Sequence, residues 1–559
     1  MLLQVENLKA YFGGDSEVVK AVDGISFHVN QGETFCLVGE SGSGKSVTAL
    51  SVIQLNPSGS TSYPSGRILF DYRQQSCEIE RVDMLRLPED VRRQIRGARI
   101  SMIFQEPMTS LNPVFTVGDQ IMESLRLHRP DMNESQARAR AIEMLEQVQI
   151  PDARRRFDEY PHRLSGGQRQ RVMIAMAMVC EPDLLIADEP TTALDVTVQA
   201  EILRLMKDLQ ARRGTSILFI THDFGVVSQM ADRLAVMRLG KIVETGPLEQ
   251  VLKNPQHAYT RQLLAALPEN MARPRAAGIA QASASGGVTK PKTPGAEPLL
   301  DLSQLQIHFP IRKGLLRRTV GYVKAVDGVT LPIPAGQILA LVGESGCGKT
   351  TLGRAILRLI EPTGGKIIYE GQDITALSRG RMKPFRRRMQ IVFQDPVSSL
   401  NPRLTVTSTL TETMAVHGIG ESREERLEIA ARTLERVQLN PSYLWRYPHE
   451  FSGGQRQRIC IARVLVLEPR FLICDEVTSA LDVSVQAEVL KMLLDLRREH
   501  SLTILFITHD ISVVEAISDE IAVMRDGQII ERGPTDQVCG APSHAYTKTL
   551  LAAVPRVRL

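Results

Sequence analysis

The sequence predicts an α/β protein with two tandem domains, each built on a largely parallel sheet that carries a phosphate-binding loop. Its 559 residues are enough for two or three domains that each bury a core. The chain also repeats itself, because VKAVDGISFHVNQGETFCLVGESGSGKS, from Val19, returns as VKAVDGVTLPIPAGQILALVGESGCGKT, from Val323. Each half alternates short β-branched runs with helical stretches, which is typical of a parallel sheet connected by helices.

The repeat extends to the end of the chain and indicates where the domains lie. HAYTRQLLAALPE, from His257, returns as HAYTKTLLAAVPR, from His544. A period this long indicates duplicated domains and not a solenoid of small repeats. We therefore expect one domain over residues 1–268 and a second over residues 299–559.

A segment of different composition, residues 269–298, separates the two copies. NMARPRAAGIAQASASGGVTKPKTPGAEP is rich in Ala, Gly, Ser and Pro, contains no aromatic residue and shows no hydrophobic periodicity. This composition predicts a flexible linker, and about 30 such residues can span several tens of ångströms. A linker of that reach allows the two domains to face each other.

Hydrophobic patterning predicts the elements inside each half. TFCLVG, LLIADE and SILFITHD are short apolar runs that predict buried strands, whereas QARARAIEMLEQVQ and VQAEILRLMKDLQ predict helices. A mostly helical segment over residues 115–165 interrupts the strands, and a matching segment runs over residues 404–452. We interpret each as a helical subdomain.

Composition is that of a globular protein, with 43% hydrophobic and 23% charged residues. The net charge of +4 is too mild for a dedicated nucleic-acid-binding protein, and we interpret the arginine-rich patches at 92–99 and 383–389 as solvated faces. The seven cysteines include no C-x-x-C pair, which predicts reduced thiols in a cytosolic compartment and no zinc or disulfide framework. No signal peptide is recognisable, and no apolar run approaches the roughly 18 residues needed to span a bilayer. A membrane would have to be reached through a partner.

Two stretches match the phosphate-loop pattern G-x-x-x-x-G-K-[ST]: GESGSGKS at 39–46 and GESGCGKT at 343–350. Each follows an apolar strand and opens a helix, which distinguishes a phosphate loop from a chance match. Backbone N–H groups and the helix N-terminus favour phosphate there. Lys45 and Lys349 would neutralise the β- and γ-phosphates of ATP, and the hydroxyl after each lysine would bind Mg²⁺. The candidate ATP-binding residues are Gly39, Ser41, Gly42, Ser43, Gly44, Lys45, Ser46, Gly343, Ser345, Gly346, Cys347, Gly348, Lys349, Thr350 and Thr351.

Each half also contains four apolar residues that end in Asp-Glu, as LLIADE and FLICDE. Ionised carboxylates at the tip of a buried strand cost several kcal/mol unless they have a use. Asp188 and Asp475 would hold Mg²⁺, directly or through water, and Glu189 and Glu476 would polarise the attacking water. Together with the phosphate loops, these pairs predict hydrolysis of a nucleoside triphosphate.

Further motifs make nearly the whole chain, the linker excepted, similar to the ATP-binding cassette (ABC) ATPases. LSGGQ and FSGGQ resemble the signature of that family, IFQEP and VFQDP its glutamine loop, and THD occurs downstream in both halves. The resemblance implies that Gln105 and Gln394 sense Mg²⁺ and that His222 and His509 hold the water and the γ-phosphate in line. It also implies that each domain has a RecA-like parallel-sheet core, an antiparallel β subdomain and a helical signature subdomain.

In that family two cassettes pair head to tail, so each ATP is capped by the signature of the other cassette. The signature residues are Ser165, Gly166, Gly167 and Gln168 in the first half and Ser452, Gly453, Gly454 and Gln455 in the second. The resemblance implies that Asp195 and Asp482 reach across the dimer. Phe12 and Phe309 lie where the family stacks an aromatic ring on adenine, although Tyr11 could serve instead.

Two features resemble the peptide, dipeptide and nickel branch of ABC importers: SLNP after each glutamine loop, and P-x-H-A-Y-T after each cassette. The halves resemble the D- and F-type ATPases of this branch, fused as in the Yej-type importers. The alternative for HAYT is a helix start capped by Thr260 or Thr547. The resemblance implies a peripheral ATPase on the cytoplasmic face of the inner membrane, which serves two integral membrane permease subunits and an extracytoplasmic solute-binding protein.

Other functions stay open. The cargo could be nickel or glutathione-like, or the chain could be a soluble twin-cassette ATPase acting on ribosomes or nucleic acid. Such soluble relatives usually carry a long charged linker, a coiled coil or zinc-binding cysteines, none of which this sequence has. Many importer relatives carry a cysteine cluster for iron and sulfur near the C-terminus, and neither tail here does. The expected cofactors are therefore ATP and Mg²⁺, without an iron–sulfur cluster.

One position raises the question whether the second copy is active. Pro190 follows Glu189, whereas Val477 follows Glu476. Proline contributes neither a ligand nor a base, and the β-branched valine suits a strand end. We therefore expect both copies to form active sites.

Overall fold

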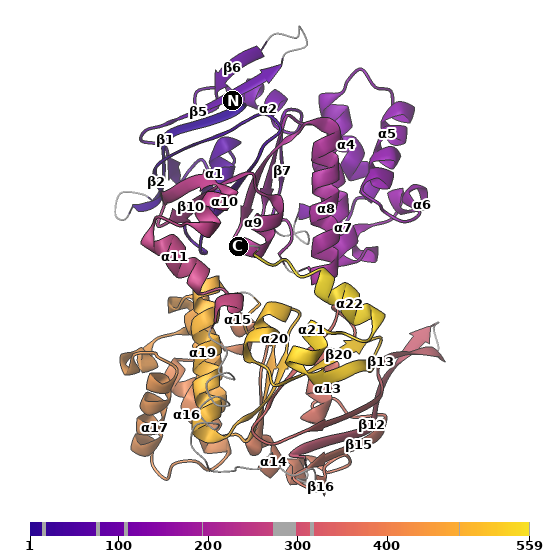
Figure 1. Ribbon diagram of the computed structural model, residues 1–559, viewed down its shortest axis with the longest axis vertical. Coiled ribbons are helices and arrows are strands. Elements are labelled where there is room, and N and C mark those ends of the chain that lie inside the picture. Colours follow the sequence, from indigo (N-terminus) through magenta and orange to yellow (C-terminus); the bar gives the residue numbers. More distant parts are fainter. Residues whose placement is uncertain are drawn as a thin grey trace. The chain divides into compact units, whose positions relative to one another are not determined.

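The structure is a computed structural model that describes residues 1–13, 18–73, 79–105, 110–192, 194–271, 298–313, 318–479 and 481–557. The chain divides into two compact units, Met1–Ala265 with Pro555–Leu559, and Ala266–Val554. In Figure 1 the first unit runs from indigo to magenta and the second from rose to yellow. Most of the expected linker lies outside the described residues, which end at Met271 and resume at Pro298.

A six-stranded sheet forms the centre of the first unit, in the order β11-β10-β3-β9-β8-β7. The strands are β3 (Thr34–Val38), β7 (Ile100–Ile103), β8 (Leu184–Asp188), β9 (Ser216–Thr221), β10 (Arg233–Arg238) and β11 (Lys241–Pro247). All neighbours pair in parallel except β10 and β11. Every residue of β3, β8 and β9 is buried, as expected for a parallel sheet covered by helices on both faces.

An antiparallel sheet forms the β subdomain of the first unit, in the order β2-β1-β5-β6, with β4 paired to β1. Its strands are β1 (Leu3–Phe12), β2 (Val19–Val29), β4 (Thr61–Ser62), β5 (Arg67–Arg73) and β6 (Ile79–Asp83). One apolar cluster joins β1, β2 and β5 to α1 (Lys45–Val52) and to the parallel sheet. Helix α1, which opens at the phosphate loop, is therefore packed in a shared core.

The helical subdomain fills the predicted segment, residues 115–165, and continues beyond it through α7. It contains α4 (Val117–His128), α5 (Glu134–Gln147), α6 (Ala153–Phe157), η1 (Pro161–Arg163) and α7 (Gly166–Met178). Side-chain caps fix where these helices begin, because Thr116 accepts a bond from the N–H of Asp119, and Asn133 and Gln136 form a capping box. The remaining helices are α2 (Glu89–Ile95), α8 (Val196–Arg213), α9 (Phe224–Met230), α10 (Leu248–Lys253) and α11 (Ala258–Ala265).

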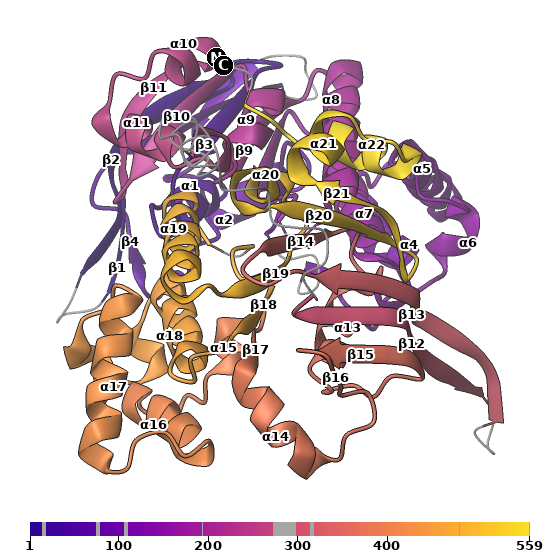
Figure 2. The same cartoon turned by 60° about the horizontal axis from the view of Figure 1, so that its bottom comes forward.

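The second unit has the same plan (Figure 2). Its central sheet has the order β17-β18-β19-β14-β20-β21, with β14 (Ile338–Val342), β17 (Met389–Val392), β18 (Phe471–Asp475), β19 (Thr503–Ile507), β20 (Glu520–Arg525) and β21 (Gln528–Pro534). The antiparallel sheet contains β12 (Leu300–Lys313), β13 (Arg318–Ile333), β15 (Gly364–Tyr369) and β16 (Gln372–Asp373). The strands β12 and β13, of 14 and 16 residues, are longer than β1 and β2, of 10 and 11 residues.

The helices of the second unit also repeat those of the first. They are η2 (Pro268–Asn270), α13 (Lys349–Ile356), α14 (Arg379–Arg388), α15 (Pro396–Ser399), α16 (Val406–Val416), α17 (Arg423–Arg436), η3 (Pro441–Trp445), η4 (Pro448–Glu450), α18 (Gly453–Leu465), α19 (Val483–His500), α20 (Ile511–Ile517), α21 (Thr535–Gly540) and α22 (Ala545–Ala552). Among the helices that the structure describes, none combines the length and the hydropathy needed to cross a bilayer. In both units, the carboxyl ends of the central parallel strands gather at one edge of the sheet, where open α/β sheets bind ligands.

Candidate active sites

Each phosphate loop connects a buried strand to a helix at this edge. The ammonium of Lys45 lies inside its own loop and donates to the carbonyl oxygens of Gly39 and Glu40, at 2.7 and 2.9 Å. Lys349 makes the equivalent bonds in the second unit, at 2.7 and 3.0 Å. Both lysines are 5% exposed, so each ammonium group lies inside the loop and not in solvent.

The last glycine of each loop is required by the close approach of a neighbouring strand. Gly44 and Gly348 have φ angles of 102° and 110°, which side chains rarely adopt. A Cβ would lie 2.3 Å from the carbonyl oxygen of Ala21 on β2, and 2.0 Å from that of Ala325 on β13. Glycine therefore lets the phosphate loop lie directly against the β subdomain.

The hydroxyl and the carboxylate expected to hold Mg²⁺ are adjacent in both units. Ser46 donates to Asp188 at 3.1 Å, and Thr350 donates to Asp475 at 3.0 Å. Burial raises the pKa of Asp188 to about 6, and it also raises the pKa of Asp475. Among the described residues no group of three or more His, Cys, Asp or Glu side chains could hold a metal ion. A hydroxyl and one carboxylate nevertheless fit Mg²⁺, which takes most of its oxygens from water and substrate phosphates.

The second carboxylate of each pair contacts the two other polar residues that the sequence singles out. Glu189 lies 3.1 Å from Nδ1 of His222 and accepts a bond from the amide of Gln105 at 2.9 Å. In the second unit Glu476 lies 3.5 Å from Nδ1 of His509 and accepts from Gln394 at 2.6 Å. The residues of three separate segments thus converge on one carboxylate in each unit.

Both glutamates are ionised in this setting. Burial would raise the pKa of Glu189, but the hydrogen bond and the charge of His222 outweigh it and hold the pKa below its usual value. The same glutamate raises the pKa of His222, although burial of the imidazole acts in the opposite direction. The pKa of Glu476 is lowered by His509 against the effect of burial in the same way. An ionised carboxylate can accept a proton from water, as a general base must.

The Asp-Glu pairs have the same backbone geometry despite the exchange of Pro190 for Val477. Glu189 and Glu476 have φ angles of 47° and 51°, a left-handed conformation that is uncommon outside glycine. The N–H of Glu189 donates to the carbonyl oxygen of Ile220 on β9, and that of Glu476 donates to the carbonyl oxygen of Ile507 on β19, at 2.9 Å in both units. Val477 is 2% exposed and belongs to the apolar core, which anchors the segment that follows the glutamate.

The signature motifs begin α7 and α18. Ser165 and Ser452 cap these helices, and the glutamine three residues later completes a capping box in each. Gly167 is needed for packing, because a Cβ would lie 2.6 Å from Val198 on α8. Around Gly166 there is open space, so the helix N-terminus presents its backbone at the surface. Asp195 and Asp482 occupy the N-cap positions of α8 and α19; their expected reach to the other cassette stays a prediction.

The aromatic residues expected at adenine lie on the first strand of each β subdomain: Phe12 ends β1, whereas Phe309 lies inside β12. Phe12 pairs with Val19, and Phe309 pairs with Val323. Each valine lies two residues before the alanine that covers the phosphate loop, and Phe309 is 42% exposed. The hydroxyl of Tyr11 donates to a carboxylate of β2 at 2.7 Å. This placement favours Phe12 over Tyr11, although adenine stacking itself stays a prediction.

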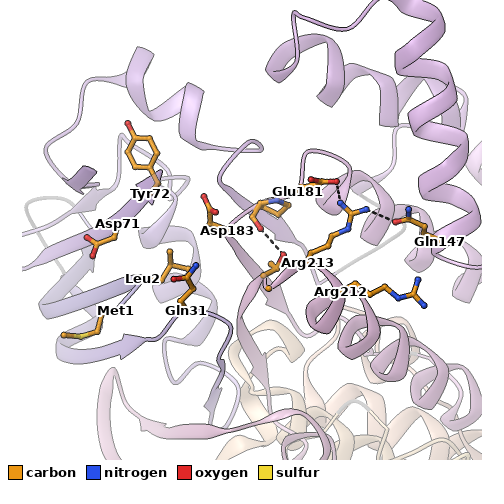
Figure 3. Close-up of a pocket in the computed structure, with 13 residues that line it drawn as sticks. Met1, Leu2, Gln31, Asp71, Tyr72, Gln147, Glu181, Asp183, Arg212 and Arg213 are labelled. Carbon is orange, nitrogen blue, oxygen red and sulfur yellow. Dashed lines mark hydrogen bonds and ion pairs between the residues drawn. The ribbon is translucent and has the colours of Figure 1, made fainter. Parts of the chain in front are cut away.

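A cavity of about 810 Å³ in the first unit lies at the other end of the sheet (Figure 3). Its lining includes Gln31, Asp183 and Thr215, each of which directly precedes or closely approaches the start of a central strand. Arg213 crosses one side of it and pairs with Glu181. The cavity is therefore at the amino edge of the sheet, opposite the phosphate loop, and takes no part in the site.

The structure corrects one reading of the HAYT motif and adds a contact that sequence patterns did not indicate. Thr260 and Thr547 do not cap the helices; both are buried, and the Nδ1 atoms of His257 and His544 accept the capping bonds. The tyrosine of each motif reaches the second residue of the phosphate loop of its own unit.

Two protein families match the sequence of this chain. The family described as ABC transporter matches residues 22–192 and 326–479, and the family described as oligopeptide/dipeptide transporter, C-terminal region, matches residues 243–292 and 530–559. The chain is 51% identical over 553 residues to the peptidoglycan transport ATP-binding protein YejF of Agrobacterium fabrum, covering 99% of this chain and 96% of that protein. It is 48% identical over 563 residues to the glutathione import ATP-binding protein GsiA of Escherichia coli K12, covering 99% and 89%. A solved structure, the dimeric post-hydrolysis ATP-binding cassette MJ0796 bound to ADP and Pi, is 26% identical over 44% of this chain and 99% of its own, with a TM-score of 0.38.

Proposed function

The chain belongs to the ABC transporter family as an ATP-hydrolysing subunit, and on that premise we propose that it powers an importer of the peptide class. One observation supports peptides as the class of cargo. The region after each cassette matches the oligopeptide/dipeptide transporter C-terminal family in both halves. The high identity to importer ATPases over almost the whole chain supports the direction of transport.

The two phosphate loops, residues 39–46 and 343–350, would bind the phosphates of ATP. Lys45 and Lys349, now bonded to loop carbonyls, would turn to the β- and γ-phosphates of ATP, and the loop N–H groups would hold the same oxygens. Mg²⁺, held by Ser46 with Asp188 and by Thr350 with Asp475, would neutralise charge on the phosphates. ATP and Mg²⁺ are thus the two small molecules that the site requires.

Hydrolysis needs a positioned water. Glu189 and Glu476 are ionised and lie at the carboxyl edge of the sheet, so each can orient water and accept its proton. His222 and His509 contact these carboxylates and would hold the γ-phosphate in line with the water. Gln105 and Gln394 bond to the same glutamates and would report the state of the site to a partner.

Each signature would complete the site of the other cassette. The N-termini of α7 and α18 present N–H groups at the surface, and a helix N-terminus binds phosphate well. The chain then carries two composite sites, with Asp195 and Asp482 at their borders. Closure on ATP and opening after hydrolysis would drive the transport cycle.

An apolar groove beside Gln105 is suited to a membrane partner. The groove has a volume of about 250 Å³ and is lined by Ile53, Leu55, Met102 and Phe104, among others. Leu55 and Phe104 are 45% and 40% exposed. Exposed apolar surface of this kind marks interaction sites. We assign it to one of two permease subunits at the cytoplasmic face of the inner membrane, with a solute-binding protein on the other side.

Glutathione-like or nickel cargo is the alternative within transport, because the permeases and the binding protein select the cargo. The structure gives no support to a nucleic-acid role for the arginine patches. Arg96 donates to the carbonyl oxygens of Ile53 and Gln54, and Arg388 pairs with Glu370 at 2.7 Å. These arginines have structural partners within the cassette.

Co-purification from a membrane fraction tests the proposal. The full chain should bring down two different integral membrane proteins, and Leu55→Asp should reduce their recovery at least about fivefold while ATP binding persists. Val320→Asp, which adds the same charge at a 58% exposed position of β13, is the matched control. A chain that stayed free of membrane proteins and sedimented with ribosomes would refute the importer function.

A further inference from the structure

The helix that follows each cassette is attached to the phosphate loop of the same cassette. The hydroxyl of Tyr259, on α11, donates to the carboxylate of Glu40 at 2.7 Å. The hydroxyl of Tyr546, on α22, accepts a bond from the N–H of Glu344 at 3.1 Å. Glu40 and Glu344 are the second residues of the two loops, so both tyrosines reach the same loop position by different atoms.

The tyrosine and the loop lysine bind different atoms of the same glutamate, Glu40 in the first unit and Glu344 in the second. The carbonyl oxygen of Glu40 accepts a bond from Lys45, and that of Glu344 accepts from Lys349. One residue therefore connects each tyrosine hydroxyl to the ammonium that would bind the nucleotide. A displacement of the hydroxyl would be transmitted to the lysine through this one residue, by its side chain and backbone in the first unit and by its backbone in the second.

Each tyrosine is itself held firmly. The guanidinium of Arg238 lies 4.6 Å from the ring centre of Tyr259, and that of Arg525 lies 4.8 Å from the ring centre of Tyr546. The rings are 4% and 7% exposed. A buried ring under a guanidinium has little freedom, so its hydroxyl occupies a fixed point beside the loop.

The start of the same helix is fixed by a second set of bonds. Nδ1 of His257 accepts the N–H of Tyr259, and Nδ1 of His544 accepts the N–H of Tyr546, both at 3.1 Å. The carboxylate of Glu244 accepts the N–H groups of Gln256 and His257, at 2.7 and 3.0 Å, and Glu531 has the same role in the second unit. The helix therefore begins at one defined place on the cassette.

We propose that Tyr259 and Tyr546 are positioning residues that brace the phosphate loops, so that the region after each cassette sets the affinity of that cassette for ATP. This role rests on the proposed assignment of the two loops to ATP. It gives the region after each cassette, which matches the oligopeptide/dipeptide transporter C-terminal family, a function inside the nucleotide site. A partner that shifted α11 or α22 would change ATP affinity without touching the nucleotide.

The test compares the full chain with the double variant Tyr259→Phe/Tyr546→Phe, which keeps both rings and both guanidinium contacts. The KM for ATP should rise about fivefold, the effect of one lost hydrogen bond, while kcat changes less than about twofold. Hydrogen exchange of the loop amides without nucleotide should become faster, with the rest of each unit unchanged. Tyr72→Phe/Tyr369→Phe, which removes two hydroxyls away from the loops, should change neither.

An unchanged KM with unchanged loop exchange would overturn the proposal. Faster exchange throughout the units, with kcat and KM falling together, would also overturn it, because that result describes a structural role alone. The single variants repeat the measurement one cassette at a time if the double variant does not fold. ATP binding by the variant Lys45→Ala/Lys349→Ala is measured in parallel. Binding that survives this change would refute the assignment of the loops to ATP, whereas the tyrosine variants test only the bracing of the loops.

Discussion

Glu189 and Glu476 have the most constrained environment of any residues in the two sites. Each has a left-handed backbone, an ionised side chain, a histidine on one carboxylate oxygen and a glutamine on the other. Strained backbone at a functional residue persists only where the surroundings enforce it. The equal geometry of the two glutamates indicates that Val477 has not inactivated the second copy.

Replacing either glutamate by glutamine tests this equality. Glu189→Gln and Glu476→Gln should each lower ATP turnover by about 100-fold or more, because the amide cannot act as a base. ATP binding should remain, since both substitutions leave the phosphate loop and its lysine in place. The exposed Glu123→Gln on α4 is the control and should keep full turnover. Normal turnover in Glu476→Gln would mean that the second site is regulatory.

The residues of the sites were predictable where a local pattern carries them. The loop lysines, the Asp-Glu pairs and the histidines belong to short motifs, and the structure brings them together as expected. The contact between Tyr259 and Glu40 joins residues 219 positions apart. No motif or periodicity links such positions, so only the fold could reveal the contact.

Packing of the signature helix depends on one glycine and not on its neighbour. A Cβ on Gly167 would lie 2.6 Å from Val198, and one on Gly454 would lie 2.4 Å from Val485, whereas Gly166 and Gly453 face open space. Gly167→Ala should therefore destabilise its cassette by about 1–3 kcal/mol, which lowers the Tm by a few degrees. Gly166→Ala, the matched control for stability, should leave the Tm unchanged or slightly higher. Equal Tm values for the two variants in thermal unfolding would contradict this packing.

The attachment of α22 should depend on pH through Glu531. Burial would raise the pKa of this carboxyl, but hydrogen bonds from the N–H and hydroxyl of Ser543 and from the N–H of His544 help to lower it from 4.5 to about 2. A depressed pKa stabilises the fold above pH 4.5, and this contribution is lost as the pH falls through about 2. Glu531→Gln should therefore lower the Tm at neutral pH, and the difference from the unaltered chain should shrink between pH 4.5 and 2. Exposed Glu435→Gln serves as the control; a difference that did not vary with pH would exclude this linkage.

The elements themselves followed closely from the sequence. Apolar runs predicted the central strands, and the helical segments lie where the pattern places them, because buried strands and capped helices have strong local signals. The arginine patches were harder to interpret, since a charge run looks the same whether solvated or bonded. Arg96 donates to backbone carbonyl oxygens that are more than 40 residues away in sequence.

At the scale of the whole molecule, the chain carries two complete sets of the residues proposed for catalysis, one set on each unit. The repeat predicted this duplication from sequence alone, and both units have the expected sheets. The proposed pairing of the two cassettes could not be predicted from any local pattern, because it depends on long-range geometry. Our central claim is that each ATP site needs residues from both halves.

Photolabelling with an azido-ATP analogue, followed by mapping of the labelled peptides, tests that claim most directly. In Ser165→Arg, a bulky charge replaces the first signature, so labelling near Lys349 should fall at least about tenfold while labelling near Lys45 persists. Ser452→Arg should give the reverse pattern. Loss of label in the cassette that carries the substitution, with the other unaffected, would contradict the account.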